Sequence, residues 1–170
     1  MATKIAPAGY SFTQISLHWI IATLVIIQLI IGEDIKPAYR AYRRGTDVTP
    51  DDLWNANIHV YIGIAIFLLA ILRFAIRLHR GVPAPPAGES VLQHWAAAAV
   101  HLVLYAAIFL MPLTGAAAWY LGIGWLGEVH ELGKPVIIIA VLLHAAGALW
   151  QHFVRKSDVL VRMLKPSARS

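Results

Sequence analysis

Eight histidines are the side chains of this sequence best suited to bind a metal or carry a proton. His18 lies near the start of a run that has no formal charge from Ser16 to Gly32. A polar ring in hydrocarbon is costly and normally persists only where something inside the protein needs it. Imidazole is a common metal ligand and an effective proton carrier. The set is His18, His59, His79, His94, His101, His130, His144 and His152.

Cysteine is absent from the chain. This excludes disulfides, cysteine-ligated iron–sulfur clusters and thioether-attached haem. Any cofactor must therefore be held by other side chains.

The elements that carry the histidines are long and apolar. Of the 170 residues, 59% are hydrophobic and 14% charged, and the mean hydropathy is +0.66. A chain with this composition is too apolar to be a soluble domain of this length. Four segments approach or exceed the ~20 residues of a membrane-spanning helix. We expect an all-α membrane protein, a single transmembrane four-helix bundle over residues 1–170. Its predicted helices are about 14–32, 58–76, 95–118 and 135–153.

The distribution of Lys and Arg predicts the orientation. The first apolar run is long and no small-residue cleavage site follows it, so we read it as a retained helix. Nine cations then fall on the side of the termini and five on the other, which places both termini in the cytoplasm. The net charge of +5 mostly reflects this bias, and nucleic-acid binding is a poor explanation for it.

With this topology the histidines fall at two membrane depths. His59 and His130 lie near the outer surface, and His18 and His144 lie deeper toward the inner side. The 14 residues from His130 to His144 advance ~21 Å and nearly four turns in a continuous helix. Pro135 lies between them and marks either a kink or a first turn. One histidine pair near each membrane face suits two bis-histidine haems stacked across the bilayer.

Other roles stay open for individual histidines. Any one of them can bond a neighbouring carbonyl or relay protons. His79 and His152 are expected to be interfacial and solvated. His94 and His101 share one face of the third predicted helix, and spacing alone also allows His101 to be the partner of His144.

Small and cationic residues accompany the pairs. Gly63 lies one turn from His59, and Gly147 lies nearly one turn from His144. Missing side chains there would let a flat macrocycle approach the backbone, although small residues also serve ordinary helix packing.

Two arginines follow the outer histidine of the second predicted helix on nearly the same helical face. Arg73 and Arg77 lie 14 and 18 residues beyond His59, ~21 to 27 Å further inward. They suit the propionates of an inner haem, and the alternative is a positive-inside anchor.

Four segments resemble the bacterial cytochrome b561 family, and the resemblance covers nearly the whole chain. They read YSFTQISLHWI, IHVYIGIAIFLLAILRFAIRL, HLVLYAAIFLMPLTG and LLHAAGALWQHFVRKSDVLVRML. The resemblance implies a four-helix protein of the bacterial inner membrane with two non-covalent b haems that exchanges electrons with ubiquinone. One branch of the family oxidises superoxide.

Carried over by motif, the resemblance implies four iron ligands. They are His18 in LHW, His59 in IHVYIG, His130 in VHE and His144 in LLHAAG. It pairs His18 with His144 and His59 with His130. It leaves His101 as a neighbour that bonds a propionate or quinone.

Two further sites are expected at the two membrane faces. A quinone site on the inner side would use His94, His101, His152 and Arg155 as hydrogen-bond donors. His152 and Arg155 can equally be surface anchors.

On the outer side, Arg40, Arg43 and Arg44 belong to a basic cluster in the first loop. If the cluster folds over the outer pair, it would concentrate a small anion such as superoxide there. Otherwise it is a solvated face.

Three functions compete at this point. The first is a superoxide:quinone oxidoreductase, and the second is a haem electron conduit for a periplasmic redox partner. The third is a haem-free transporter of metal or protons. The predicted spans contain no carboxylate, which disfavours the transporter.

Overall fold

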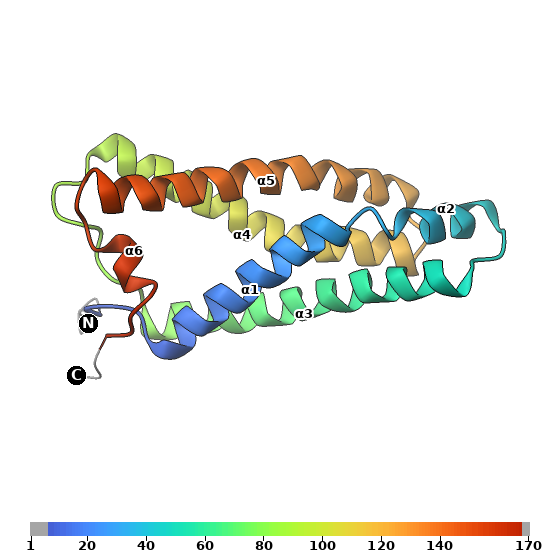
Figure 1. Ribbon diagram of the computed structural model, residues 1–170, viewed down its shortest axis with the longest axis horizontal. Helices are drawn as coiled ribbons and strands as arrows, with labels where there is room; N and C mark the ends of the chain where they lie inside the picture. Colours follow the sequence, from blue (N-terminus) through green and yellow to red (C-terminus); the bar gives the residue numbers. More distant parts are fainter. Residues whose placement is uncertain (1–6, 168–170) are drawn as a thin grey trace.

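The computed structural model describes residues 7–167, and its long helices form an elongated bundle (Figure 1). Within this range every regular element is helical. The helices are α1 (Phe12–Ile31), α2 (Lys36–Arg44), α3 (Pro50–Arg80), α4 (Val91–Tyr120), α5 (Gly124–Phe153) and α6 (Val159–Arg162). Four of them are long and apolar enough to cross a membrane, namely α1, α3, α4 and α5. The expected all-α membrane fold with four spanning helices is confirmed.

The two described chain ends meet at the same end of the bundle. The Ser167 amide donates a hydrogen bond of 3.1 Å to the Tyr10 carbonyl. We call this the terminal end, and α6 lies there. The opposite end, where α2 lies, is the α2 end (Figure 1).

Side-chain caps fix where the long helices begin. The Ser11 side chain accepts from the Gln14 amide while the Gln14 side chain accepts from Ser11, which closes a capping box on α1. Ser90 and Gln93 build the same box on α4. Thr49 caps α3 by accepting from the backbone amide three residues on.

The long helices extend beyond the apolar segments from which they were predicted. The largest difference is in α5, which begins at Gly124 rather than near residue 135. Pro135 lies inside this helix. Proline removes one backbone donor and crowds one carbonyl, but neighbouring turns keep their bonds, so the helix continues through it. Because α3, α4 and α5 have 30 or 31 residues, they span ~45 Å and project beyond the ~30 Å hydrocarbon core.

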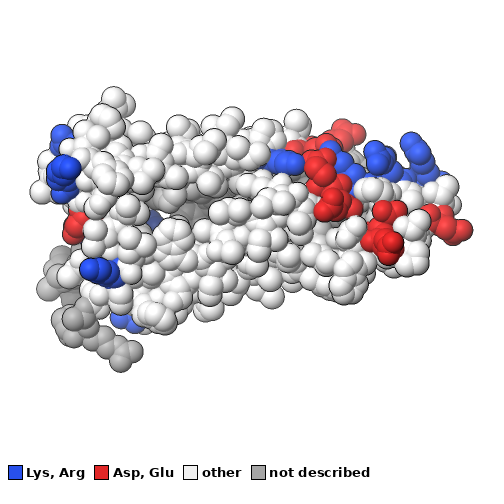
Figure 2. Space-filling model, in the orientation of Figure 1, with Lys and Arg blue, Asp and Glu red and all other residues white. Residues whose placement is uncertain are grey.

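The outside of the bundle is apolar and its charges gather at the ends. Leu92, Leu102 and Ile30 expose 71–79% of their surface. Figure 2 shows Lys, Arg, Asp and Glu at both ends and an almost uncharged visible surface between them. This distribution matches a lipid-facing girdle between two wetted ends.

Packing between the helices is uneven. Close contacts join α4 to α5, α1 to α3, and α3 to α4. The tightest positions are small residues, with Ala56 and Ala70 fully buried and Ala118 nearly so. Among the described residues no large side chain is completely buried. The helices α1 and α5 are therefore less closely packed against each other, and the visible surface is hollowed between them (Figure 2).

Candidate functional site

The bundle brings five of the histidines into two groups. His59 of α3 faces His130 of α5 at the α2 end, with ring centroids 6.0 Å apart. Nearer the terminal end, His18 of α1 faces His144 of α5 at 6.1 Å. His101 of α4 lies closer still to His144, at 5.1 Å. Each facing pair joins two helices from opposite sides of the bundle.

The distances separate two possible partners for His144. An iron ion held ~2 Å from one nitrogen of each imidazole would place the two ring centroids roughly 6.3 Å apart. The pairs His59–His130 and His18–His144 come close to this spacing. His101 lies too near His144 for an ion between the rings, and the rings meet edge to face at 75°. The side chains present thus fit two bis-histidine metal centres, and His101 fits the role of a neighbour.

One ring of the α2-end pair is held by the backbone of α4. The Nδ1 atom of His130 lies 2.8 Å from the Met111 carbonyl oxygen, so its N–H donates there. Thr114 also donates to the Met111 carbonyl and lies 3.4 Å from the same ring nitrogen. A metal-ligating histidine usually fixes its other nitrogen in this way. The arrangement leaves Nε2 of His130 as the nitrogen free to bind a metal.

The other ring of this pair has an incomplete set of contacts. The Gln28 side chain donates a 2.8 Å hydrogen bond to the His59 backbone carbonyl. Nδ1 of His59 and Oε1 of Gln28 are both buried, and neither finds a partner among residues 7–167. Sequence reasoning missed both Gln28 and Met111. A glutamine inside an apolar span was the available signal for Gln28, whereas a backbone carbonyl leaves none.

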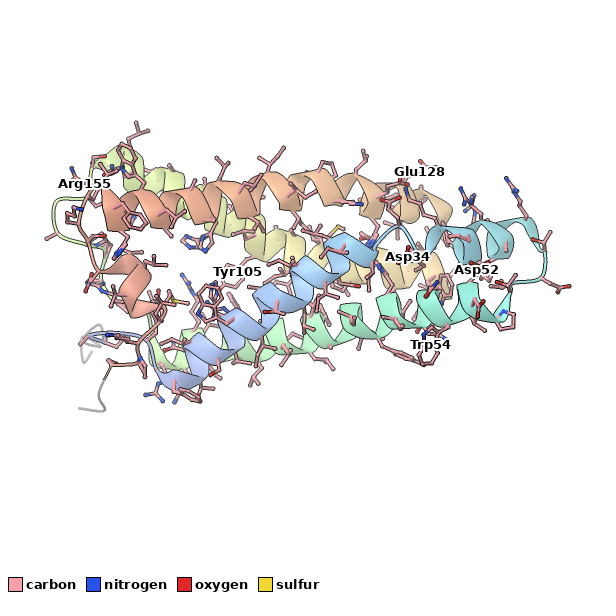
Figure 3. The ribbon with its side chains drawn as sticks, viewed as in Figure 1. Asp34, Asp52, Trp54, Tyr105, Glu128 and Arg155 are labelled. Atoms are coloured by element: carbon pink, nitrogen blue, oxygen red, sulfur yellow. The ribbon has the colours of Figure 1, made fainter. Side chains whose placement is uncertain are left out.

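Two arginines lie in the half of the bundle that holds His18 and His144, nearer the terminal end, which we call the terminal half. Arg73 donates a 2.6 Å bond to the Gln14 carbonyl, and the guanidinium of Arg77 lies 5.4 Å from the centre of the Tyr105 ring. No carboxylate of the described chain pairs with either of them. Figure 3 shows Tyr105 in this half of the bundle. A small pocket is lined by Tyr10, Gln14, Arg73, Arg77, Val82 and Tyr105.

The two glycines singled out in the sequence have different surroundings. A Cβ on Gly147 would meet nothing within 4 Å, so the backbone near His144 is open to a bulky group. A Cβ on Gly63 would lie 3.4 Å from the Gln28 amide nitrogen. The space beside Gly63 is therefore shared with a side chain of α1.

The four residues expected to form a quinone site lie in three places at the terminal end. Arg155 donates to the Gly88 carbonyl at 2.6 Å, and His94 lies 3.4 Å from the carboxylate of Glu89, so these two flank the connection between α3 and α4. His101 lies with the histidine group. His152 lines a separate open groove of about 470 Å³ with Phe153, Lys156, Ser157, Asp158 and Val161. Arg155 is labelled at this end in Figure 3.

At the α2 end, aromatic rings dock α2 on the junction of α4 and α5. Tyr39 and Tyr42 both stack on Trp119, with centroids 6.4 and 6.1 Å apart. A Cβ on Gly124 would overlap the Arg43 guanidinium, so Arg43 lies against the start of α5. Arg40, Arg43 and Arg44 are exposed, and none forms an ion pair within the described range.

A four-residue ion network ties the turn before α2 to α5, next to His130. Lys36 lies 2.7 Å from Glu33 and 2.6 Å from Glu131, and Lys134 lies 2.6 Å from Glu33. Hydrogen bonds from Lys134 and Lys36 lower the pKa of Glu33 to about 2. Bonds to Glu131 and Glu33 raise the pKa of Lys36.

Because of this network, we expect wild type to be more stable than Glu33→Gln only at a pH where Glu33 is ionised. Because the Glu33 pKa falls from 4.5 to about 2 on folding, its ionised form stabilises the fold above pH 4.5 and loses this effect as the pH falls toward 2. Thermal unfolding in detergent should show Glu33→Gln melting at most a few degrees below wild type at pH 5–8, since the pairs are exposed. The gap should close at acid pH and shrink in high salt. A gap that widened toward pH 3 would contradict the network.

Comparisons with known proteins agree with the all-helical membrane fold. The model of the family described as prokaryotic cytochrome b561 matches residues 9–166. The chain belongs to the prokaryotic cytochrome b561 family. It is 36% identical over 160 residues to cytochrome b562 of Cereibacter sphaeroides, covering 93% of this chain and 96% of that protein. It is 28% identical over 176 residues to the probable superoxide oxidase CybB of Yersinia pestis, covering 91% and 95%. Cytochrome b561 homolog 1 of Escherichia coli is 28% identical over 181 residues, covering 91% and 96%.

Membership of the cytochrome b561 family decides the class of function. The protein is a multi-pass membrane electron-transfer protein that binds haem b. The haem-free transporter is thereby set aside. Within residues 7–167, no group of three or more His, Cys, Asp or Glu side chains is arranged to hold a metal ion, and the histidine rings instead face one another in pairs.

Proposed function

We propose that this cytochrome oxidises superoxide at the α2 end and reduces ubiquinone at the terminal end. Two b haems would be held by His18 with His144 and by His59 with His130. The observation that carries this proposal is the pair of facing histidines near each end of the bundle, 6.1 and 6.0 Å apart. A single haem would need only one such pair.

The orientation follows from charge. The terminal end carries most of the Lys and Arg residues, including those of α6 and of the last turn of α3. We infer that this end faces the cytoplasm and that the membrane is the bacterial inner membrane. The α2 end then meets the periplasm, and residues 1–170 act as one transmembrane domain.

The reaction balances with simple stoichiometry. Two superoxide anions each give up one electron and leave as O₂, and one ubiquinone gains two electrons and two protons. Bound haem b supplies reversible one-electron acceptance and donation. The chain itself has to attract an anion at one end, hold the quinone head and deliver protons to it at the other. In a bilayer, the apolar spanning helices would keep the histidine pairs away from bulk water.

Residues of the terminal half suit the haem and quinone roles assigned to them. Arg73 and Arg77 have no carboxylate partner in the described chain and would neutralise haem propionates. His94 and His152 can pass protons from the cytoplasm. His101 and Arg155 supply further hydrogen-bond donors.

A second function is favoured by the exposed surface of the α2 end. Tyr42, Trp54 and Trp125 expose 51–67% of their surface, and Tyr42 belongs to the same helix as the arginines. Aromatic residues and arginine are enriched in protein interfaces. This surface would suit a periplasmic redox protein, and the cytochrome would then be an electron conduit for that partner.

The quinone assignment is tested by four single substitutions to Ala or Gln, at His94, His101, His152 and Arg155. We expect at least one variant to raise the KM for a soluble ubiquinone analogue several-fold while the haem content stays intact. Full quinone reduction in all four would move the quinone site elsewhere. Superoxide-driven haem reduction in the same preparations tells the oxidase from the conduit, because a conduit would not respond to superoxide.

The close packing of Gly115 predicts a local effect on one haem. A Cβ at this position would lie 2.8 Å from Cε1 and 2.9 Å from Nδ1 of His130. The Met111 carbonyl holds the ring in place, so Gly115→Ala has to displace it, at a cost of about 1–3 kcal/mol. We expect weakened binding of one haem, seen as substoichiometric haem and an altered reduced-minus-oxidised spectrum. An unchanged spectrum and haem content would show that His130 relaxes freely.

A further inference from the structure

Gln28 is a polar side chain within an apolar spanning helix that no part of the proposed function uses. Its amide nitrogen donates to the His59 carbonyl at 2.8 Å. Its amide oxygen is buried and has no partner among the residues described. An unsatisfied buried amide oxygen is costly, so such a group calls for an explanation.

A second unpartnered buried atom lies on the residue that Gln28 already contacts. Nδ1 of His59 is also buried and unpartnered within residues 7–167. A Cβ on Gly32, one turn beyond Gln28, would lie 3.9 Å from Cε1 of His59, the ring carbon bonded to both ring nitrogens. The ring carbon between the two nitrogens therefore lies near α1, about one turn from Gln28. One atom is an acceptor and the other, in the tautomer that leaves Nε2 for a metal, is a donor.

The two members of the α2-end pair differ in how they are held. His130 donates its Nδ1 proton directly to the Met111 carbonyl. A ligating histidine needs such an acceptor to fix its tautomer and orientation and to raise its basicity. For His59, the unsatisfied buried acceptor on the adjacent helix is Gln28 Oε1. A Cβ on Gly63, one turn further along α3, would lie 3.4 Å from the Gln28 amide nitrogen, so this amide packs against α3 beside His59.

We propose that Gln28 is the positioning residue for His59, accepting its Nδ1 proton through one bridging water molecule. The water would accept from His59 and donate to Gln28, which satisfies both buried atoms. Gln28 thus holds His59 twice, at the backbone carbonyl and at the ring. This inference rests on the proposed assignment of His59 as an iron ligand.

The consequence is a defined influence on the redox potential of one haem. A hydrogen bond accepted from the distal nitrogen of a ligand makes the imidazole more electron-donating and favours the oxidised metal. Loss of the acceptor should therefore raise the midpoint potential of the α2-end haem and leave the other haem unchanged.

The test is a potentiometric titration of the purified holoprotein, followed by its visible spectrum. The α2-end component is identified as the one missing from His59→Ala. Gln28→Leu removes both contacts, whereas Gln28→Glu keeps an acceptor oxygen and loses the amide donor to the His59 carbonyl. We expect an upward shift of the α2-end component in Gln28→Leu and no upward shift in Gln28→Glu. Gln14→Leu, the same change near the other end of α1, is the matched control and should leave this component unmoved.

Other outcomes have distinct meanings. Equal upward shifts in Gln28→Leu and Gln28→Glu would show that only the backbone contact matters and would overturn the proposal, as would no shift in Gln28→Leu. If the leucine variant lost the haem, Gln28→Met, which keeps the length of the side chain, would replace it in the comparison. A wild-type protein with no component that depends on His59 would instead contradict the proposed ligands.

Discussion

Replacing His59 or His130 with alanine is expected to lower the haem content from two per chain to one. Each variant would remove one of the two imidazole nitrogens proposed to hold the iron, and the remaining ring alone would bind the haem much more weakly. The same changes at His18 or His144 should remove the other haem. Haem extraction and the reduced-minus-oxidised spectrum measure both losses, and the two classes of variant should retain spectrally different haems.

The controls use histidines that the structure places outside the proposed pairs. His94 lies beside Glu89 at the connection before α4, so His94→Ala should keep both haems. His101→Ala is the sharper control, because His101 lies only 5.1 Å from His144. If His101→Ala lost a haem while His18→Ala kept both, the pairing at the terminal half would have to be reassigned to His101 and His144. If all four alanine variants of the proposed ligands kept two haems, the ligand assignment would be wrong.

Neutralising Arg40, Arg43 and Arg44 together is expected to slow superoxide-driven haem reduction by about tenfold at low ionic strength. Electrostatic focusing by a charged surface raises capture rates by roughly 10 to 10³-fold, and these cations are exposed and unpaired within the described residues. Docking of α2 through Tyr39 and Tyr42 on Trp119 fixes the arginines at the end that holds His59. Stopped-flow spectroscopy with a superoxide source measures the rate.

Salt and a matched variant distinguish focusing from general damage. The wild-type rate should fall as ionic strength rises, since screening shortens to ~8 Å near 0.15 M salt, and the triple variant should respond less. Replacing Arg80, Lys156 and Lys165 with Gln removes the same charge at the terminal end and should leave the rate unchanged. A rate independent of salt and identical in both triple variants would rule out focusing. No reduction by superoxide at all would favour the electron conduit.

The sequence alone determined the class of protein and the depths of its histidines. In a chain of 170 residues, four long uncharged runs fit a bilayer far better than a soluble core, and helices satisfy their backbone there. Because a helix rises by a fixed 1.5 Å per residue, spacing along the chain predicts the depth of each histidine. The continuity of α5 through Pro135 was left open by the sequence, since proline both starts and kinks helices, and the structure shows one continuous helix.

Only the tertiary structure decided which side chains face one another. Periodicity gives the face of each helix but not the lateral order of the helices, which depends on how small residues such as Ala70 and Ala140 let neighbouring backbones approach. Spacing along the chain therefore left His18 and His101 as rivals for His144, and only the family resemblance implied His18. The ring spacings of 6.1 and 5.1 Å favour the same pairing.

The partners of the ring nitrogens were also beyond the sequence. The acceptor for His130 is a backbone carbonyl, a group that every residue carries and no motif marks. The contact of Gln28 with His59 joins residues 31 positions apart on different helices. Such contacts arise from packing between elements, so the local pattern of either helix holds no sign of them.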